Sequence, residues 1–170
     1  TNTVDKTYQI NEKLTWLNER YIQSLDKDDL ASRCVHFLVE AGVGVDPALL
    51  ERAMPLVNER MNTLADVVGL LRFLFSDDIE PTDKARSLLA KAPEGYLKEA
   101  ADALDACPGW DAQQIAVTLD ALAERAGLNR TKGWQPIRAA VTGSNVSPPL
   151  PESLELLGRE RTVARVRAAA

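Results

Sequence analysis

The sequence predicts an all-α protein made of two small helical subdomains. Leucine and alanine are abundant while aromatic residues make up only 5% of the chain, and this balance favours helices packed on helices over a β-sandwich. Apolar residues recur at helical spacing in one segment after another, and no segment stands out with the alternating pattern of a strand. In a chain of 170 residues, we expect about ten helices joined by short connections.

The first subdomain, residues 10–75, carries clear helix start and stop signals. Its helices are expected at residues 11–25, 26–42, 46–61 and 63–75. Asp46 is a suitable N-cap with a proline directly after it, and Thr63 is a plausible cap for the last segment, which is apolar on most sides and therefore buried. Pro55 predicts a kink or a break inside the third segment, because proline lacks the N–H that a helix interior uses.

A polar and acidic stretch, SDDIEPTDKA at residues 76–85, interrupts the helical pattern most strongly. It contains Pro81, and Thr82 is a candidate N-cap for the helix that follows. We take this stretch as the seam between two helical subdomains. A lead of residues 1–9 then precedes the first subdomain, and the second covers residues 82–170.

The second subdomain shows the same kind of signals. Its helices are expected at residues 84–91, 94–107, 111–127, 134–143, 151–158 and 159–170. Asp111 and Gln114 form a capping box, and Gly127 ends the helix that they start. In WQPIRAAVTG, Pro136 is expected in the first turn of a helix, where its missing N–H costs nothing, and Gly143 is expected to end that helix.

The cysteines and the histidine argue against a metal site. Cys34 and Cys107 are isolated, and His36 is the only histidine. A metal site needs about four ligands, whereas Cys34 and His36 supply at most two in divergent directions. We expect both thiols to be small buried hydrophobic groups and His36 to pack within its helix. The chain also lacks a glycine-rich phosphate loop and a nucleophile elbow, so no catalytic residue is predicted.

The hydrophobicity of the chain predicts a cytoplasmic protein. No apolar run approaches the roughly 18–20 residues needed to span a bilayer. The first residues, TNTVDKTYQI, lack the basic start and the apolar stretch of a secretory signal. We therefore expect no membrane partner.

Charge is distributed unevenly along the chain. The net charge is −5, but residues 125–170 hold eight basic and three acidic side chains, whereas the preceding residues hold 12 basic and 22 acidic ones. A basic end on an acidic body can form an electrostatic footprint for phosphates. Equally, the arginines of residues 159–167 can complement the negative end of a last helix. Charge alone leaves both interpretations open.

Residues 134–150, WQPIRAAVTGSNVSPPL, are the best candidate for a binding surface. Here a helix that carries Arg138 breaks into a polar loop, and two prolines fix the backbone so that the loop loses little entropy on binding. An arginine can stack on unpaired bases or donate to base edges, and small polar groups can read Watson–Crick edges. The alternative is a glycine–proline turn that merely ties two helices together.

Three stretches resemble the C-terminal half of bacterial-type glutamyl-tRNA synthetase, a class I enzyme that joins glutamate to its tRNA. INEKLTWLNERYI (residues 10–22) resembles the segment with a Lys-Leu-x-Trp-x-Asn core just after the catalytic half. LLERAMPLVNERMNTLADV (residues 49–67) is similar to a helix pair of the first anticodon-binding subdomain. Residues 134–150 and LELLGRERTVARV (residues 154–166) resemble the closing signature. The matches occur in family order over nearly the whole chain.

The resemblance implies an α-helical cage, the anticodon-binding domain of a class I synthetase, which binds the anticodon loop of tRNA-Glu. It implies that one arginine of the first subdomain reads the third anticodon base, while a helix and a loop of the second subdomain touch the anticodon. The implied contacts are Arg60, then Gln135 and Arg138 on the helix, and Asn145, Ser147, Pro148 and Leu150 on the loop. We expect the protein to be a monomer.

Two departures from the family pattern affect these contacts. Asn145 and Ser147 stand where the best-known members have leucine and threonine, so the individual base contacts differ. Asp120 stands where some members use a basic residue, and a carboxylate does not serve a phosphate.

The resemblance also places the chemistry outside this chain. The family's nucleotide-binding fold would precede residue 10, and nothing in residues 1–9 replaces it. Glutamate–tRNA ligase activity, with ATP and Mg²⁺, is therefore expected of the full-length parent, and this chain by itself is expected to be inactive and to need no cofactor. The alternative function is a helical protein–protein interaction scaffold without RNA binding, which would use the apolar faces of residues 63–75 and 111–127.

Overall fold

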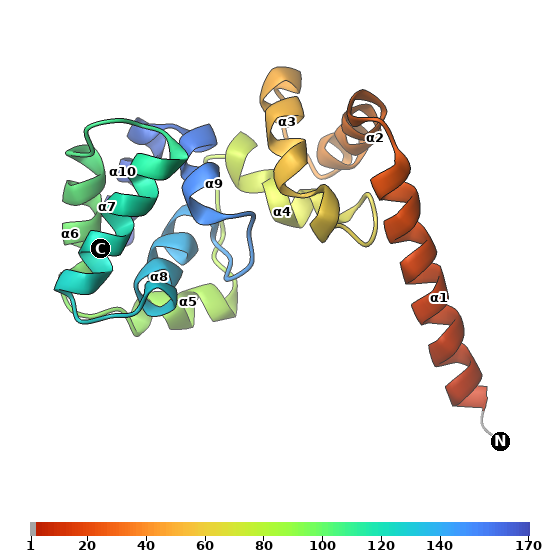
Figure 1. Ribbon diagram of the computed structural model, residues 1–170, viewed down its shortest axis with the longest axis horizontal. Coiled ribbons are helices and arrows are strands. Elements are labelled where there is room, and N and C mark those ends of the chain that lie inside the picture. Colours follow the sequence, from red (N-terminus) through yellow and green to blue (C-terminus); the bar gives the residue numbers. More distant parts are fainter. Residues whose placement is uncertain (1–2) are drawn as a thin grey trace. The chain divides into compact units, whose positions relative to one another are not determined.

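The computed structural model describes the backbone of residues 3–170 and, within this range, the side chains of residues 13–26 and 28–170. The described residues form ten α-helices and two 3₁₀ helices and contain no strand, which confirms the predicted all-α class (Figure 1). The chain divides into two compact units, Thr1–Phe75 and Ser76–Ala170. No helix in the described part combines the length and the apolar character needed to cross a membrane.

The first unit is organised around α2, which packs against both α3 and α4. Its described elements are α1 (Thr3–Ser24), α2 (Lys27–Glu40), α3 (Pro47–Ala53), η1 (Met54–Leu56), η2 (Asn58–Arg60) and α4 (Asp66–Phe75). Large side chains from these elements are almost completely removed from solvent, which is the main source of stability for short helices. They include Leu38, Leu50, Met54, Met61, Leu71 and Leu74.

Two local predictions for the first unit are confirmed. Asp46 caps α3, because its carboxylate accepts a hydrogen bond from the backbone N–H of Ala48 at 3.0 Å. The break expected at Pro55 also occurs, since α3 ends at Ala53 and the chain continues as the 3₁₀ helix η1. Both features follow from local chemistry that the fold does not override.

The predicted start of the last helix at Thr63 is wrong. That helix, α4, begins at Asp66, three residues later. The Asp66 carboxylate accepts hydrogen bonds from the backbone N–H groups of Asn62 at 2.8 Å and Thr63 at 2.9 Å. An aspartate that bonds back to the preceding turn satisfies these donors outside the helix, so the Thr63 hydroxyl is not needed as a cap.

The two thiols and the histidine behave differently from one another. Cys34 and Cys107 are 0% and 2% exposed, which confirms that they are small buried groups. Burial raises the pKa of the Cys34 thiol to about 11. The packed role expected for His36 is wrong: its side chain is exposed on α2, and Nε2 lies 3.4 Å from a carboxylate oxygen of Glu40, one turn further on.

The second unit surrounds α8, which packs against α5, α7 and α10. Its elements are α5 (Asp83–Ala90), α6 (Tyr96–Asp105), α7 (Ala112–Arg125), α8 (Arg130–Thr142), α9 (Leu150–Leu157) and α10 (Arg159–Ala168). The predicted caps at Thr82 and Asp111 are confirmed, since each side chain accepts a backbone N–H of the helix that it starts. The core between the helices consists of fully buried side chains that include Leu104, Ile115, Leu119, Leu122 and Ile137.

Pro136 does not begin a helix, contrary to the sequence prediction. It lies inside α8, which starts at Arg130 with Asn129 as its N-cap; the Asn129 side chain accepts the backbone N–H of Lys132 at 2.9 Å. A proline inside a helix costs about 3 kcal/mol in general. Here Pro136 is buried on α8, and it lines the cavity between α8 and α5, which pack against each other.

The segment that precedes α5 is fastened to α10 and to the end of α8. Asp77 accepts hydrogen bonds from the guanidinium groups of Arg161 at 2.7 Å and Arg165 at 3.2 Å. Arg165 also donates to the backbone oxygens of Ser76 at 2.7 Å and Val141 at 2.9 Å. The side chain of Arg165 therefore joins three segments that are far apart in the sequence.

This cluster predicts an acid-sensitive contribution to the stability of the second unit. Arg161, and after it Arg165, lowers the pKa of the Asp77 carboxyl by hydrogen bonding and charge. A lowered pKa means that the ion pair stabilises the fold above the ordinary carboxyl range, and that this stabilisation is lost as the pH falls through the lowered pKa. Between about pH 5 and about pH 2, the melting temperature of the wild type should therefore fall more steeply than that of Asp77→Asn.

Thermal melts followed by circular dichroism at several pH values would measure this difference. Asp78→Asn is the matched control, because Asp78 is the adjacent exposed carboxylate, and it should follow the wild type. Parallel acid profiles for Asp77→Asn and the wild type would contradict the prediction.

Candidate nucleic-acid interface

The loop after α8 is held by hydrogen bonds within its own residues. Helix α8 ends at Gly143, whose φ of +67° lies in the left-handed region, as the sequence predicts for a glycine at this position. The Thr142 hydroxyl accepts the backbone N–H of Ser144 at 3.2 Å, and the Ser144 hydroxyl accepts that of Val146 at 3.1 Å. Together with the two prolines that follow, these bonds give the loop a defined shape.

Arg138 fastens this loop to the helix. Its Nη1 donates to the backbone oxygens of Pro148 at 2.9 Å and Ser147 at 3.3 Å, and it also contacts the Ser147 hydroxyl. The guanidinium group therefore spans from one turn of α8 to the far end of the loop. A charged donor to a carbonyl makes a stronger hydrogen bond than a neutral one, so Arg138 is a main support of the loop.

The structure separates the loop residues of the predicted contact set into two groups. Ser147 is 3% exposed, Leu150 is 0% exposed and Pro148 is also buried, so these side chains face the protein. Asn145 is half-buried, and its neighbour Val146 is 55% exposed. Base contacts for Ser147, Pro148 and Leu150 stay predictions, because in the described structure these residues are almost completely buried.

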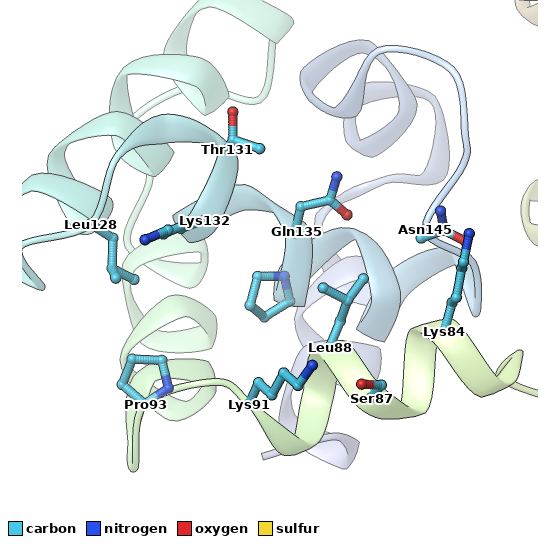
Figure 2. Close-up of a pocket in the computed structure, with 11 residues that line it drawn as sticks. Lys84, Ser87, Leu88, Lys91, Pro93, Leu128, Thr131, Lys132, Gln135 and Asn145 are labelled. Atoms are coloured by element: carbon cyan, nitrogen blue, oxygen red, sulfur yellow. The ribbon is translucent and has the colours of Figure 1, made fainter.

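Gln135 and Asn145 line the same cavity, of about 640 Å³, between α5 and α8 in the second unit (Figure 2). Gln135 comes from the middle of α8 and Asn145 from the loop, so the turn at Gly143 brings the two amides to one site. The Gln135 side-chain oxygen is buried and accepts no hydrogen bond in the described structure. A buried amide oxygen without a partner is costly, and a ligand with N–H donors can satisfy it.

None of the sequence motifs indicated that α5 contributes to this cavity. Lys84, Ser87, Leu88 and Lys91 line it from α5 and its C-cap. Spacings of three, four and seven residues place these side chains on one face of a helix. That spacing was the available signal, but it does not reveal which other helix the face meets.

Arg60 belongs to the first unit and lies at the last position of the 3₁₀ helix η2. Its side chain is exposed, whereas Val57 and Met61 on either side are 0% and 1% exposed. The backbone N–H of Arg60 donates to the carbonyl of Val57 at 2.8 Å. These two buried side chains fix the short helix and leave the guanidinium group of Arg60 turned to solvent.

The arginines of α10 are engaged within the protein. Arg159 donates to the backbone oxygens of Asp105 at 2.7 Å and Cys107 at 2.6 Å, which satisfies carbonyls at the end of α6. Arg167 pairs with the Asp105 carboxylate at 2.9 Å, and Arg161 pairs with Asp77 as described above. The arginines that make the sequence of this helix basic are therefore hydrogen-bonded to carboxylates and carbonyls of other elements.

Asp120, the acidic departure on α7, forms a bidentate ion pair with Arg130 at the start of α8. Its Oδ1 accepts from Nε of Arg130 at 2.9 Å, and its Oδ2 contacts Nη2. The hydrogen bond and the charge of Asp120 raise the pKa of the Arg130 guanidinium. The guanidinium carbon also lies 4.9 Å from the centre of the Trp134 ring. Asp120 thus holds the guanidinium group of Arg130 near position 120, where the resemblance implies a basic residue in some family members.

Known proteins match this chain over most of its length. A family model described as "Anticodon binding domain" matches residues 29–170. Glutamate–tRNA ligase from Acidothermus cellulolyticus is 43% identical over 99% of this chain and 35% of its own length. The enzyme of the same name from Saccharopolyspora erythraea is 39% identical over 92% of this chain and 33% of its own length. The chain thus spans about a third of the length of the curated relatives that it matches.

Solved structures agree with these matches. A glutamate–tRNA ligase from Elizabethkingia meningosepticum, crystallised with its amino acid, gives a TM-score of 0.78 at 26% identity and covers 93% of this chain and 32% of its own. A glutamate–tRNA synthetase from Elizabethkingia anophelis gives a TM-score of 0.75 at 26% identity, over 93% of this chain and 31% of its own. These matches confirm the resemblance inferred from the sequence motifs and favour it over a protein-interaction scaffold. Since the family model covers most of the sequence, this chain belongs to the anticodon-binding domain family.

Proposed function

We propose that this chain binds the anticodon loop of tRNA-Glu as the C-terminal part of a glutamate–tRNA ligase. The observation that supports this most directly is the loop after α8, which Arg138 holds beside a cavity lined by the amides of Gln135 and Asn145. A receptor for splayed bases needs donors and acceptors that are fixed before binding, because mobile groups lose entropy when they are ordered. The two units serve as two anticodon-binding subdomains, residues 10–75 and 82–170.

The side chains of this surface have distinct roles in the proposed complex. The Gln135 amide, with its oxygen free to accept, pairs with the edge of a base, and Asn145 offers a second amide from the loop. Ser147, Pro148 and Leu150 are the remaining contacts of the proposed set, in the loop shape that Arg138 maintains. Each good pair of hydrogen bonds to a base edge contributes about 1–3 kcal/mol of discrimination.

The complete ligase, in this proposal, attaches glutamate to tRNA-Glu with ATP and Mg²⁺ in the part of the relatives that this chain does not span. The residues described here include no group of three or more side chains that could hold a metal ion. We further propose that the protein acts in the cytoplasm, where tRNAs are charged, and that it binds tRNA as a monomer.

Binding to an isolated anticodon stem-loop tests the proposal. The chain should bind a tRNA-Glu stem-loop in a gel-shift or fluorescence measurement, and its affinity should fall with added salt as phosphate contacts are screened. The scaffold alternative predicts indifference to RNA together with retention of a protein partner. Indifference to every stem-loop tested would overturn the proposal.

Arg60→Gln should weaken discrimination at the third anticodon base. The exposed guanidinium of Arg60 can donate two hydrogen bonds to one base edge, whereas glutamine lacks that planar charged fork. The wild type should prefer the tRNA-Glu stem-loop over one with an altered third base, and the variant should lose about 1–3 kcal/mol of this preference. Competition binding with the two stem-loops measures it.

Arg52→Gln is the matched control for this prediction. Arg52 is also an exposed arginine of the first unit, on the neighbouring helix α3, and its replacement should leave the preference unchanged. If Arg60→Gln keeps the full preference, Arg60 is not the residue that reads this base, even where the stem-loop is still bound.

A further inference from the structure

Lysines gather at the cavity between α5 and α8. Residues 76–170 contain four lysines, and three of them line this one cavity: Lys84 on α5, Lys91 at its C-cap and Lys132 in the first turn of α8. The fourth, Lys98, lies on α6 and is exposed away from the lining. The fold therefore brings together ammonium groups from positions almost 50 residues apart in the sequence.

These ammonium groups are uncompensated, unlike most arginines of the same unit. None of the three lysines forms an ion pair with a carboxylate of the described residues. No aspartate or glutamate lines the cavity. By contrast, Arg130, Arg161 and Arg167 are paired with carboxylates. The cavity is thus a concentrated positive site on a unit whose other cations are largely neutralised, and it suits an anion.

The rest of the lining suits the flat face of a base. Apolar atoms make up most of the accessible area of the cavity, and polar side chains lie among them, which is a usual composition for a site that binds a small organic group. The apolar side chains are Leu88, Pro93, Leu128 and Pro136, and the uncharged polar ones are Ser87, Thr131, Gln135 and Asn145. A cavity of about 640 Å³ is large enough for one nucleotide and too small for a folded protein segment with its own core.

The lysines are distributed along the cavity. Figure 2 shows Lys84 with Asn145 at one end, Lys132 with Leu128 at the other, and Lys91 with Leu88 between them, while Gln135 lies across from α5. Successive phosphates of an extended nucleic-acid strand are several ångströms apart, so cations at both ends can contact the phosphates on either side of one base.

We propose that helix α5 is an RNA-binding element, and that this cavity holds one unstacked nucleotide whose flanking phosphates contact Lys84, Lys91 and Lys132. The base lies against Leu88 and Pro136 with its edge toward Gln135. This inference rests on the proposed function, which it extends to a helix and to three lysines that the sequence motifs did not include. The lysines supply affinity that is independent of sequence, and Gln135 with Asn145 supplies selectivity.

The salt dependence of binding tests the phosphate contacts. The triple variant Lys84→Gln/Lys91→Gln/Lys132→Gln should bind the tRNA-Glu anticodon stem-loop more weakly and with a shallower salt dependence. A phosphate contact on a single strand contributes about 0.7 to the slope of log K against log salt, so three lost contacts should reduce it by about 2. Lys98→Gln, the exposed lysine outside the cavity, is the matched control and should keep both affinity and slope. All four lysines are exposed, so the variants should fold like the wild type.

Photocrosslinking gives a second, direct readout. A stem-loop with 4-thiouridine at its unpaired positions should crosslink to peptides that contain residues 84–91 or 128–136, which line the cavity. If the wild type binds the stem-loop but the triple variant keeps its slope, or the crosslinks fall outside these peptides, this inference fails and the proposed function stands. If the wild type binds no stem-loop, both fail.

Discussion

Gly143→Ala should destabilise the second unit by about 3–4 kcal/mol. Two effects combine at this position. The φ of +67° is unfavourable for any residue with a Cβ, which costs about 1–2 kcal/mol. The added Cβ would also lie 2.4 Å from Cγ2 of Ile79 and 3.2 Å from the backbone oxygen of Glu80. Overpacking of this kind costs about 1–3 kcal/mol.

The backbone has little room to relieve this clash. The Gly143 carbonyl accepts the backbone N–H of Thr82 at 2.9 Å, and the Gly143 N–H donates to the carbonyl of Ala139. A shift of Gly143 away from Ile79 would therefore break the contact between the loop and the segment before α5. Urea denaturation followed by tryptophan fluorescence would report the loss of free energy of unfolding.

Gly127→Ala separates the two effects. Gly127 has the same φ of +67°, but nothing lies within 4 Å of the position of its Cβ. Its replacement should cost only the backbone term of about 1–2 kcal/mol. If the two variants lose the same free energy, the close approach of Ile79 to Gly143 does not limit this site. The difference between them also predicts function, because only Gly143→Ala should displace the loop and weaken RNA binding.

Local chemistry made much of the fold predictable. The caps at Asp46, Thr82 and Asp111 and the break at Pro55 follow from interactions between residues close in sequence, and the structure confirms each of them. Pro136 shows where local rules end. Its position inside α8 depends on the cap at Asn129 and on the packing of α8 against α5. Packing between helices that are distant in the sequence cannot be predicted from neighbouring residues alone.

The charge pattern left two interpretations open for a related reason. A basic excess along residues 125–170 suggested a footprint for phosphates, yet Arg161 and Arg167 meet carboxylates that come from earlier parts of the chain. The uncompensated cations that line the cavity are lysines, and Lys84 and Lys91 come from residues 1–124, the part of the sequence that is acidic overall. Binding depends on charges that lie close together in space, and here the fold brings together lysines that are far apart in the sequence.

The structure gives different surroundings to two residues of the candidate site. Motif similarity singled out both Gln135 and Arg138, which are three positions apart on α8. The structure places Gln135 in the lining of the cavity and gives Arg138 carbonyl partners in the loop. The sequence motif alone suggests that Arg138 contacts bases, whereas the folded structure shows that it holds the loop after α8. Its replacement separates these roles.

Arg138→Lys should weaken binding of the anticodon stem-loop by about 100-fold, through the loop rather than through a lost base contact. Arginine reaches the carbonyls of Ser147 and Pro148 with a planar group, whereas the compact lysine ammonium does not reproduce this geometry. Unpaired carbonyls cost about 1–3 kcal/mol, which is enough to leave the binding shape of the loop as a minor population. Affinity then falls in proportion to the fraction of molecules with the competent loop.

Hydrogen exchange without RNA distinguishes this mechanism from direct reading. The backbone N–H groups of Ser144 and Val146 are hydrogen-bonded within the loop, and their exchange should accelerate in Arg138→Lys. Ser147→Ala is the matched control, since it removes the hydroxyl beside Arg138 but keeps both carbonyl partners, and it should change exchange and affinity much less. If Arg138→Lys loses affinity while its loop exchanges like that of the wild type, Arg138 acts on the nucleotide itself. If protection of the loop is instead lost before any RNA is added, Arg138 acts by maintaining the loop, because no base contact exists in the RNA-free protein.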